Sequence, residues 1–194
     1  MERRLHKRAG YSTNSRGMYI PEVDYMVMQQ IMDALRETNQ GENVIGLCGP
    51  DNRVQHFANT ATRRAERDQL FQKIITATVT KKPDIIHLQT QIGDAIGLTF
   101  VIETNLPEST SWMRFGNNKR MTIAARAVLL RAKMKKLQTV LVVLNDVHGR
   151  LDLGEIGIPF GDDHNGCKIL MTSTSVEVFS QQMKVDKLID TDMP

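Results

Sequence analysis

A short segment of the chain occupies the position of a phosphate-binding loop but lacks the residues that bind phosphate. An apolar, β-compatible run, Val44–Cys48, is followed by the turn residues Gly49-Pro50. A P-loop has the pattern G-x-x-x-x-G-K-[ST], in which backbone N–H groups surround the phosphates, lysine neutralises them and the hydroxyl binds magnesium. Counting from Gly49, the positions of the second glycine, the lysine and the hydroxyl hold Val54, Gln55 and His56. By its motif, this segment is not a P-loop.

A second apolar run ends in polar residues. Val140–Leu144 is followed by Asn145 and Asp146. In P-loop proteins an acidic residue after such a strand binds magnesium, but Asp and Asn also favour the turns that end ordinary strands. A polar role in ligand binding and a role as an end-of-strand cap both remain open for Asp146.

Two charged residues near the turn have opposite implications for phosphate binding. Asp51 places a negative charge where a phosphate would lie, whereas the guanidinium of Arg53 could bind a phosphate in a bidentate manner. We interpret His56 as a solvent-facing histidine near the start of a helix.

Other residues with ligand chemistry do not predict a metal site. Asp162, Asp163 and His164 are consecutive and cannot all converge on one ion, so an exposed loop is expected. Cys48 and Cys167 are isolated and adjoin apolar runs, which favours two reduced, buried thiols.

Apolar spacing predicts helices that alternate with strands. The remaining elements are a helix from Pro21 to Asn39–Gly41, a helix over 57–70, a strand over Ile74–Val79, a helix opened by Pro83-Asp84, an irregular connection over 100–118, a helix over Ile123–Leu137, a strand over Lys168–Thr172, a helix over Ser175–Met183 and a strand at Leu188–Ile189. This order predicts an α/β sandwich around a parallel sheet. Ligands bind beyond the carboxyl edge of such sheets, which directs attention to Gly49–His56, Asn145–His148 and Ser173–Ser175.

Composition excludes several classes of protein. Of the 194 residues, 41% are hydrophobic and 24% charged, as in globular domains. A formal charge of +3 and 5% aromatic residues do not predict nucleic-acid binding. No apolar run approaches the ~18 residues that a membrane span needs, and no signal peptide is apparent, so a cytoplasmic protein without membrane insertion is expected.

Four ordered segments resemble one family. These are Ile31–Leu35 with Val44–Leu47, Phe71–Thr80 continuing to Pro83–Ile85, Leu141–Val147 followed by Leu151–Leu153 and Ile156–Phe160, and Gly166–Ser173. Together they resemble the NB-ARC domain of coiled-coil-type nucleotide-binding, leucine-rich-repeat disease resistance proteins of plants. The resemblance covers about residues 20–190 in the same order and spacing.

The resemblance implies a fold and a role. The fold is a P-loop NTPase-like three-layer sandwich with a mainly parallel sheet, here lacking the later helical and winged-helix subdomains. The family binds ADP at rest and exchanges it for ATP, which lets the receptor oligomerise and signal defence. The chain is expected to comprise a flexible tail over 1–20 and a partial NB-ARC domain over 21–194.

The departures from the family lie where it binds nucleotide. Asp51–Phe57 stands where members carry Gly-Gly-Val-Gly-Lys-Thr-Thr, Asn145 replaces an aspartate, Asp146 keeps the second acidic position, and Thr174 replaces an arginine. The positions that match the family's nucleotide site are Gly49, Pro50, Asp51, Asn52, Arg53, Val54, Gln55, His56, Asn145, Asp146 and Thr174.

The resulting hypothesis is a non-catalytic fragment of an immune receptor with weak or lost nucleotide binding. No cofactor is expected to bind tightly, and ADP or ATP with Mg²⁺ is implied by resemblance only. Expected partners are other immune receptor chains or host proteins. One alternative is a nucleotide-independent interaction module or decoy that uses Leu106–Lys119 and the basic helix after it. Another is a non-functional pseudogene product.

Overall fold

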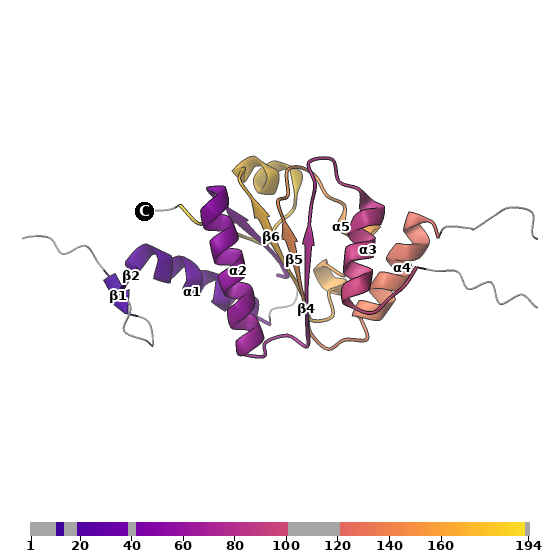
Figure 1. Cartoon of the computed structure of the whole chain (residues 1–194), viewed down its shortest axis with the longest axis horizontal. Helices are drawn as coiled ribbons and strands as arrows, with labels where there is room; N and C mark the ends of the chain where they lie inside the picture. Colours follow the sequence, from indigo (N-terminus) through magenta and orange to yellow (C-terminus); the bar gives the residue numbers. More distant parts are fainter. Residues whose placement is uncertain (1–10, 14–18, 39–41, 101–120, 193–194) are drawn as a thin grey trace, which may run out of the picture.

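A parallel five-stranded sheet forms the centre of the protein (Figure 1). The computed structural model describes residues 11–13, 19–38, 42–100 and 121–192. The strands of this sheet are β3 (Val44–Cys48), β4 (Lys73–Thr78), β5 (Val140–Asn145), β6 (Cys167–Ser173) and β7 (Lys187–Asp190). They are arranged in the order β4-β5-β6-β3-β7, and each neighbouring pair is parallel. The predicted parallel sheet is therefore confirmed.

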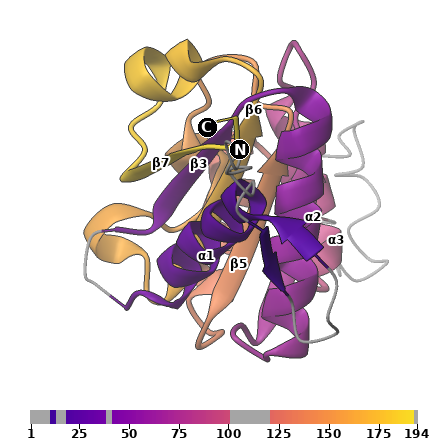
Figure 2. The ribbon, with the colours of Figure 1, turned by 90° about the vertical axis from the view of Figure 1, so that its left-hand side faces the viewer.

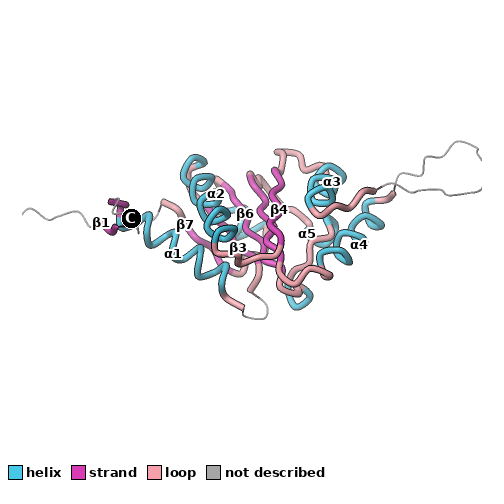
Figure 3. The backbone as a smooth tube through the Cα atoms, turned by 60° about the horizontal axis from the view of Figure 1, so that its bottom comes forward, coloured by secondary structure: helices cyan, strands magenta, loops and turns pink. Residues whose placement is uncertain are grey.

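Helices cover both faces of the sheet. Helices α1 (Glu22–Arg36) and α2 (Asp51–Arg67) lie on one face, which Figure 2 views from the front. Helices α3 (Ile85–Ala95), α4 (Ile123–Met134) and α5 (Leu153–Ile156) lie on the other, and Figure 3 shows the same three layers from below. Two shorter helical segments, Gly161–Asp163 and Val178–Gln182, precede and follow β6.

Each face of the sheet has its own apolar core. Ile45, Leu47 and Leu141 point toward α1 and α2, whereas Val142 and Leu144 point toward α3, α4 and α5. Side chains alternate between faces along a strand, so a strand between two helical layers is apolar at every position. Strand β5 is apolar because it is covered by helices on both faces. The three-layer, P-loop NTPase-like architecture confirms the prediction.

The start of α2 corrects the sequence-based prediction. A helix was expected over 57–70, but α2 begins at Asp51 and ends at Arg67. No glycine or proline interrupts residues 51–67. Pro50 has φ −57°, a backbone angle that suits the position immediately before a helix. Residues 51–56, which precede the expected helix, therefore form the first turns of α2.

Smaller differences concern the ends of the elements. Helix α1 ends at Arg36, and Asn39–Gly41 lies outside the described residues, as does most of the connection expected over 100–118. Within the segment expected to be a flexible tail, β1 (Tyr11–Thr13) and β2 (Tyr19–Pro21) pair in antiparallel fashion. The division of the chain at residue 20 stays a prediction. No helix within the described ranges combines the length and apolar character that crossing a membrane requires.

Candidate functional site

Three segments that are distant in sequence meet at the carboxyl edge of the sheet. They enclose a cavity of about 340 Å³. Its lining residues come from the start of α2, the segment after β5 and the end of β6: Asp51, Val54, Gln55, Asp146, His148, Thr172, Ser173 and Thr174. Parallel strands place all their carboxyl ends on one edge, so this is where a ligand of such a fold binds.

The connection between β3 and α2 consists only of Gly49 and Pro50. Gly49 has φ +139°, and a Cβ atom there would lie 2.3 Å from Thr191 Oγ1, so both backbone angle and space require glycine. The N–H groups of Arg53 and Val54 donate to Pro50 O at 2.9 and 3.0 Å. In a P-loop, backbone amides of this segment face the phosphates; here those of Arg53 and Val54 are used within the helix.

A side-chain hydrogen bond crosses the cavity. Gln55 Nε2 donates to Asp146 Oδ1 at 2.8 Å, which joins α2 to the residue after β5. Asp146 has φ +61°, a conformation that Asp tolerates better than most residues. Its backbone N–H donates to Thr172 Oγ1 at 3.0 Å. Asp146 is thus fixed from two sides, by α2 and by β6.

Asn145 is the last residue of β5 and carries an unpaired polar atom. Its backbone oxygen accepts from Val79 N–H at 2.8 Å, but its buried Oδ1 has no hydrogen-bond partner among the described residues. The resemblance noted in the sequence leads to the expectation of an aspartate at this position, where the chain has an amide. A neutral amide is a weaker ligand for Mg²⁺ than a carboxylate.

Arg53 is directed away from the cavity. Its Nη2 lies 2.8 Å from Asp24 Oδ1 on α1, and its Nε donates to Thr191 O at 2.8 Å, just after β7. Its guanidinium also lies 5.5 Å from the centre of the Phe57 ring. Arg53 therefore connects α2 to α1 and to the segment after β7.

The residues present do not fit a nucleotide phosphate. The cavity lining includes the carboxylates of Asp51 and Asp146 and the imidazole of His148, but neither lysine nor arginine. A carboxylate repels a phosphate at close range, and the hydroxyls of Thr172, Ser173 and Thr174 carry no compensating charge.

Other candidate residues lie outside the cavity. Asn52 is exposed and its Oδ1 accepts from Arg53 N–H at 3.0 Å, while His56 is exposed and contacts the edge of Phe57. Sequence reasoning did not single out Thr172, Asp24 or Thr191. Their positions depend on the pairing of strands and the packing of helices, and no local motif indicates them.

The remaining polar clusters are structural. Asp163 forms ion pairs with Lys135 and Arg131, and Lys135 lowers its pKa. No group of three or more metal-ligating side chains occurs within the described ranges. Cys48 and Cys167 are free and buried, and burial raises their pKa values to about 11 and about 12.

Comparison with known proteins identifies the family. A sequence model of the NB-ARC domain matches residues 24–193. The chain is 26% identical over 153 residues to disease resistance protein SUMM2 of Arabidopsis thaliana, which covers 78% of this chain and 15% of that protein. It is 33% identical over 103 residues to the probable disease resistance protein At5g47260 of the same plant, covering 50% of this chain and 11% of that protein.

A solved structure supports the fold. The crystal structure of Cdc6p from Pyrobaculum aerophilum aligns with 88% of this chain and 45% of its own chain, at a TM-score of 0.51 and 11% identity. That likeness concerns the fold alone. Because the NB-ARC model matches residues 24–193 of the 194-residue sequence, the chain belongs to the NB-ARC domain family.

Proposed function

We propose that this chain is the nucleotide-binding-fold domain of a plant disease resistance receptor in which binding of ADP and ATP is weak or lost. One observation carries the proposal: Gly49 and Pro50 alone connect β3 to α2, and α2 begins at Asp51. A phosphate-binding loop needs several backbone amides directed at one point. A helix that begins two residues after the strand leaves no room for such a loop.

The missing side chains weaken binding further. A charge-assisted hydrogen bond contributes about 1.5–3 kcal/mol, so loss of the lysine and of one further phosphate contact weakens binding by at least ~100-fold. Asp51 at the cavity adds repulsion rather than attraction. Hydrolysis would also need a positioned phosphate and a metal ion, so no catalytic activity is proposed.

Contacts within the protein replace those that a nucleotide would make. The Gln55–Asp146 hydrogen bond joins α2 to β5, and Arg53 joins α2 to Asp24 and Thr191. These contacts hold the start of α2 against its neighbours without a ligand. They favour a domain whose shape does not depend on nucleotide.

The biological setting is part of the proposal. The chain spans 15% of SUMM2 and 11% of At5g47260, so the activity of a whole receptor goes beyond the domain itself. NB-ARC domains are signalling switches of the P-loop NTPase family. We place this one in the cytoplasm, where it acts in defence through other immune receptor chains or host proteins and not through nucleotide exchange.

Isothermal titration of the chain with ADP and Mg²⁺ tests the proposal. The expected result is no measurable binding heat with ADP up to about 1 mM. A dissociation constant below 1 µM would contradict the proposal, because it corresponds to a binding free energy more favourable than about −8 kcal/mol.

A further inference from the structure

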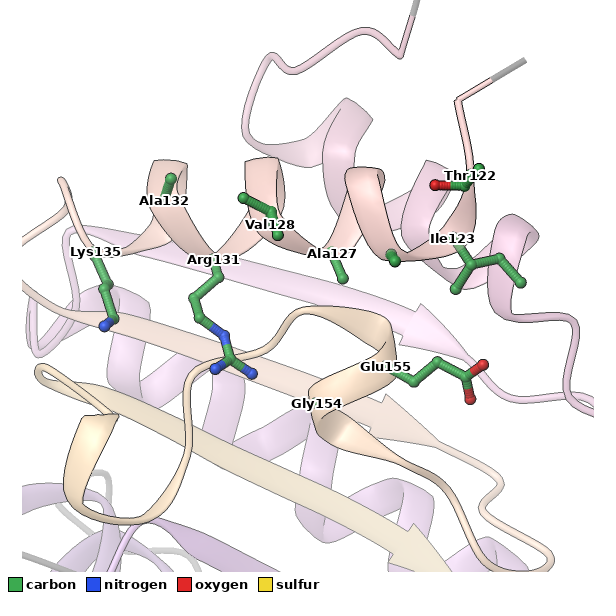
Figure 4. Close-up of a pocket in the computed structure, with 10 residues that line it drawn as sticks. Thr122, Ile123, Ala127, Val128, Arg131, Ala132, Lys135, Gly154 and Glu155 are labelled. Atoms are coloured by element: carbon green, nitrogen blue, oxygen red, sulfur yellow. The ribbon is translucent and has the colours of Figure 1, made fainter. Parts of the chain in front are cut away.

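A wide apolar groove lies on the opposite face of the sheet from α1 and α2. It has a volume of about 740 Å³ and runs along α4 beside the start of α5 (Figure 4). The residues that line it are Thr122, Ile123, Ala124, Ala127, Val128, Arg131, Ala132, Lys135, Gly154 and Glu155. None of them contributes to the cavity beyond β3.

Helix α4 is apolar on both sides. Ala127, Leu130 and Met134 face the core, while Val128 is 67% exposed and Leu129 is 39% exposed on the outer side. A surface helix normally has one apolar stripe and a polar opposite face. Helix α4 also contains Arg126, Arg131 and Lys133, but its outer side exposes apolar residues beside them. The outer side of α4 therefore has the composition of an interface.

Charges are distributed unevenly along this groove. Arg131 and Lys135 lie at the end formed by the last turns of α4, and Glu155 lies at the other end, below Ile123 (Figure 4). Gln89 Nε2 donates to Ile123 O at 2.9 Å and to Glu155 O at 3.1 Å, which fixes Glu155 beside the first turn of α4.

The basic end of the groove retains a positive charge. Asp163 forms ion pairs with both Lys135 and Arg131, but one carboxylate neutralises only one of the two cations. The groove is therefore positive at one end, negative at the other and apolar between them. A twofold axis perpendicular to the helix brings opposite ends of two such grooves together.

We propose that a second copy of this chain occupies the groove, with the two α4 helices packed antiparallel about a twofold axis at Val128. A helix rises about 1.5 Å per residue. Ile123, and with it Glu155, lies about 7.5 Å from Val128 along the axis, while Arg131 and Lys135 lie about 4.5 and 10.5 Å away on the other side. In the antiparallel dimer the partner subunit's Glu155 falls between Arg131 and Lys135.

The residues at the centre suit close contact. Ala124, Val128 and Ala132 follow one another at intervals of four on the outer side, and such a row forms the ridge that packs into a groove of a facing helix. A twofold interface repeats each contact, so two identical ion-pair sets flank one apolar centre. Because one helix pair buries little surface, a weak, reversible dimer is expected.

Analytical ultracentrifugation of the whole chain tests this arrangement. The expected result is a concentration-dependent monomer–dimer equilibrium as the chain is raised to about 200 µM. Val128→Asp places two carboxylates at the axis and should leave a monomer. Met26→Asp changes an apolar residue of α1 that is 56% exposed, and it should leave the dimer intact. Circular dichroism checks that both variants are folded.

A charge exchange tests the antiparallel register. Glu155→Arg should weaken dimerisation at least 10-fold, because it faces two cations. Adding Arg131→Glu to this variant should restore dimerisation. Arg131 is chosen over Lys135 because its ion pair with Asp163 is the longer of the two, at 3.9 Å. A monomer at the highest concentration, a dimer unaffected by Val128→Asp, or a double variant that remains weak would overturn the proposal. Its outcome is independent of ADP binding, since the groove and the cavity share no residue.

Discussion

Gln55 and Asp146 are 91 residues apart in sequence, and a hydrogen bond of 2.8 Å joins their side chains across the candidate site. In P-loop proteins the equivalent region contains a lysine and a magnesium-binding acid with phosphate between them. Here Gln55, a neutral amide at the position where a P-loop would have its lysine, bonds directly to Asp146, the residue after Asn145. The two sides of the site are thus joined without a ligand.

Removal of this hydrogen bond should reduce stability. Gln55→Ala is expected to lower the free energy of unfolding by about 1 kcal/mol, because the bond is partly buried and its acceptor is charged. Gln55→Glu should destabilise more at pH 7, since it places a second carboxylate beside Asp146.

The pH dependence of the stability of Gln55→Glu separates the effect of charge repulsion from that of altered packing. Near pH 4 the carboxyl group introduced by Gln55→Glu is partly protonated, which relieves the repulsion, so the stability deficit of this variant relative to the unmodified chain should shrink. Gln29→Ala removes an exposed hydrogen bond of 3.3 Å within α1 and should change stability by less than about 0.5 kcal/mol. Urea unfolding at pH 7 and pH 4 provides the comparison, and equal losses for Gln29→Ala and Gln55→Ala would contradict it.

Restoring the lysine alone should not restore nucleotide binding. In Gln55→Lys the new ammonium group lies beside Asp146 and pairs with it, while the backbone amides of Arg53 and Val54 still bond to Pro50. Calorimetric titration with ADP and Mg²⁺ should therefore detect no binding below about 1 mM.

A loop graft provides the matched comparison. Replacing Asp51–Phe57 by Gly-Gly-Val-Gly-Lys-Thr-Thr reintroduces both the glycines and the charge, and it should improve ADP affinity relative to Gln55→Lys by at least ~100-fold. If the single substitution binds as well as the graft, the short connection between β3 and α2 is not what excludes nucleotide.

Gly49 should be intolerant of any side chain. Gly49→Ala is expected to destabilise the protein by about 2–4 kcal/mol, since φ is +139° and the added Cβ would lie 2.3 Å from Thr191 Oγ1. Gly97→Ala is a control for backbone strain, because φ is +67° and, chain neighbours aside, no heavy atom of the described residues lies within 4 Å of the added Cβ, so a loss of about 1 kcal/mol is expected. Thermal unfolding would measure both, and similar losses would show that contact with Thr191 is unimportant.

The two thiols should react slowly in the folded protein. Burial raises the pKa of Cys48 to about 11 and that of Cys167 to about 12, so little thiolate exists at pH 8. Alkylation by iodoacetamide should become faster only as the pH approaches 11, or after unfolding in urea. Rapid labelling of either cysteine at pH 8 without urea would contradict this prediction.

The sequence was sufficient to predict the sheet because its strands are buried on both sides. Val44–Cys48 and Val140–Leu144 are apolar at every position, and the structure has strands at both places. The start of α2 was not predicted, because Gly49-Pro50 is a turn signal that does not specify the length of the turn.

Long-range contacts of the site could not be predicted from local pattern. Thr191 reaches Gly49 because β7 pairs with β3, and Asp24 reaches Arg53 because α1 packs beside α2. The Gln55–Asp146 bond likewise depends on the order of strands in the sheet. The sequence indicated which segments meet at the carboxyl edge of the sheet, and tertiary packing determines which of their residues contact one another.

The free energy of unfolding with and without ADP tests the proposed loss of nucleotide binding most directly. A ligand that binds only the folded state stabilises it by RT ln(1 + [L]/Kd), which is about 4 kcal/mol at 1,000 times Kd. At about 1 mM ADP with Mg²⁺, weak or lost binding predicts a change below ~0.5 kcal/mol. A gain of about 4 kcal/mol, corresponding to Kd near 1 µM, would contradict the proposal.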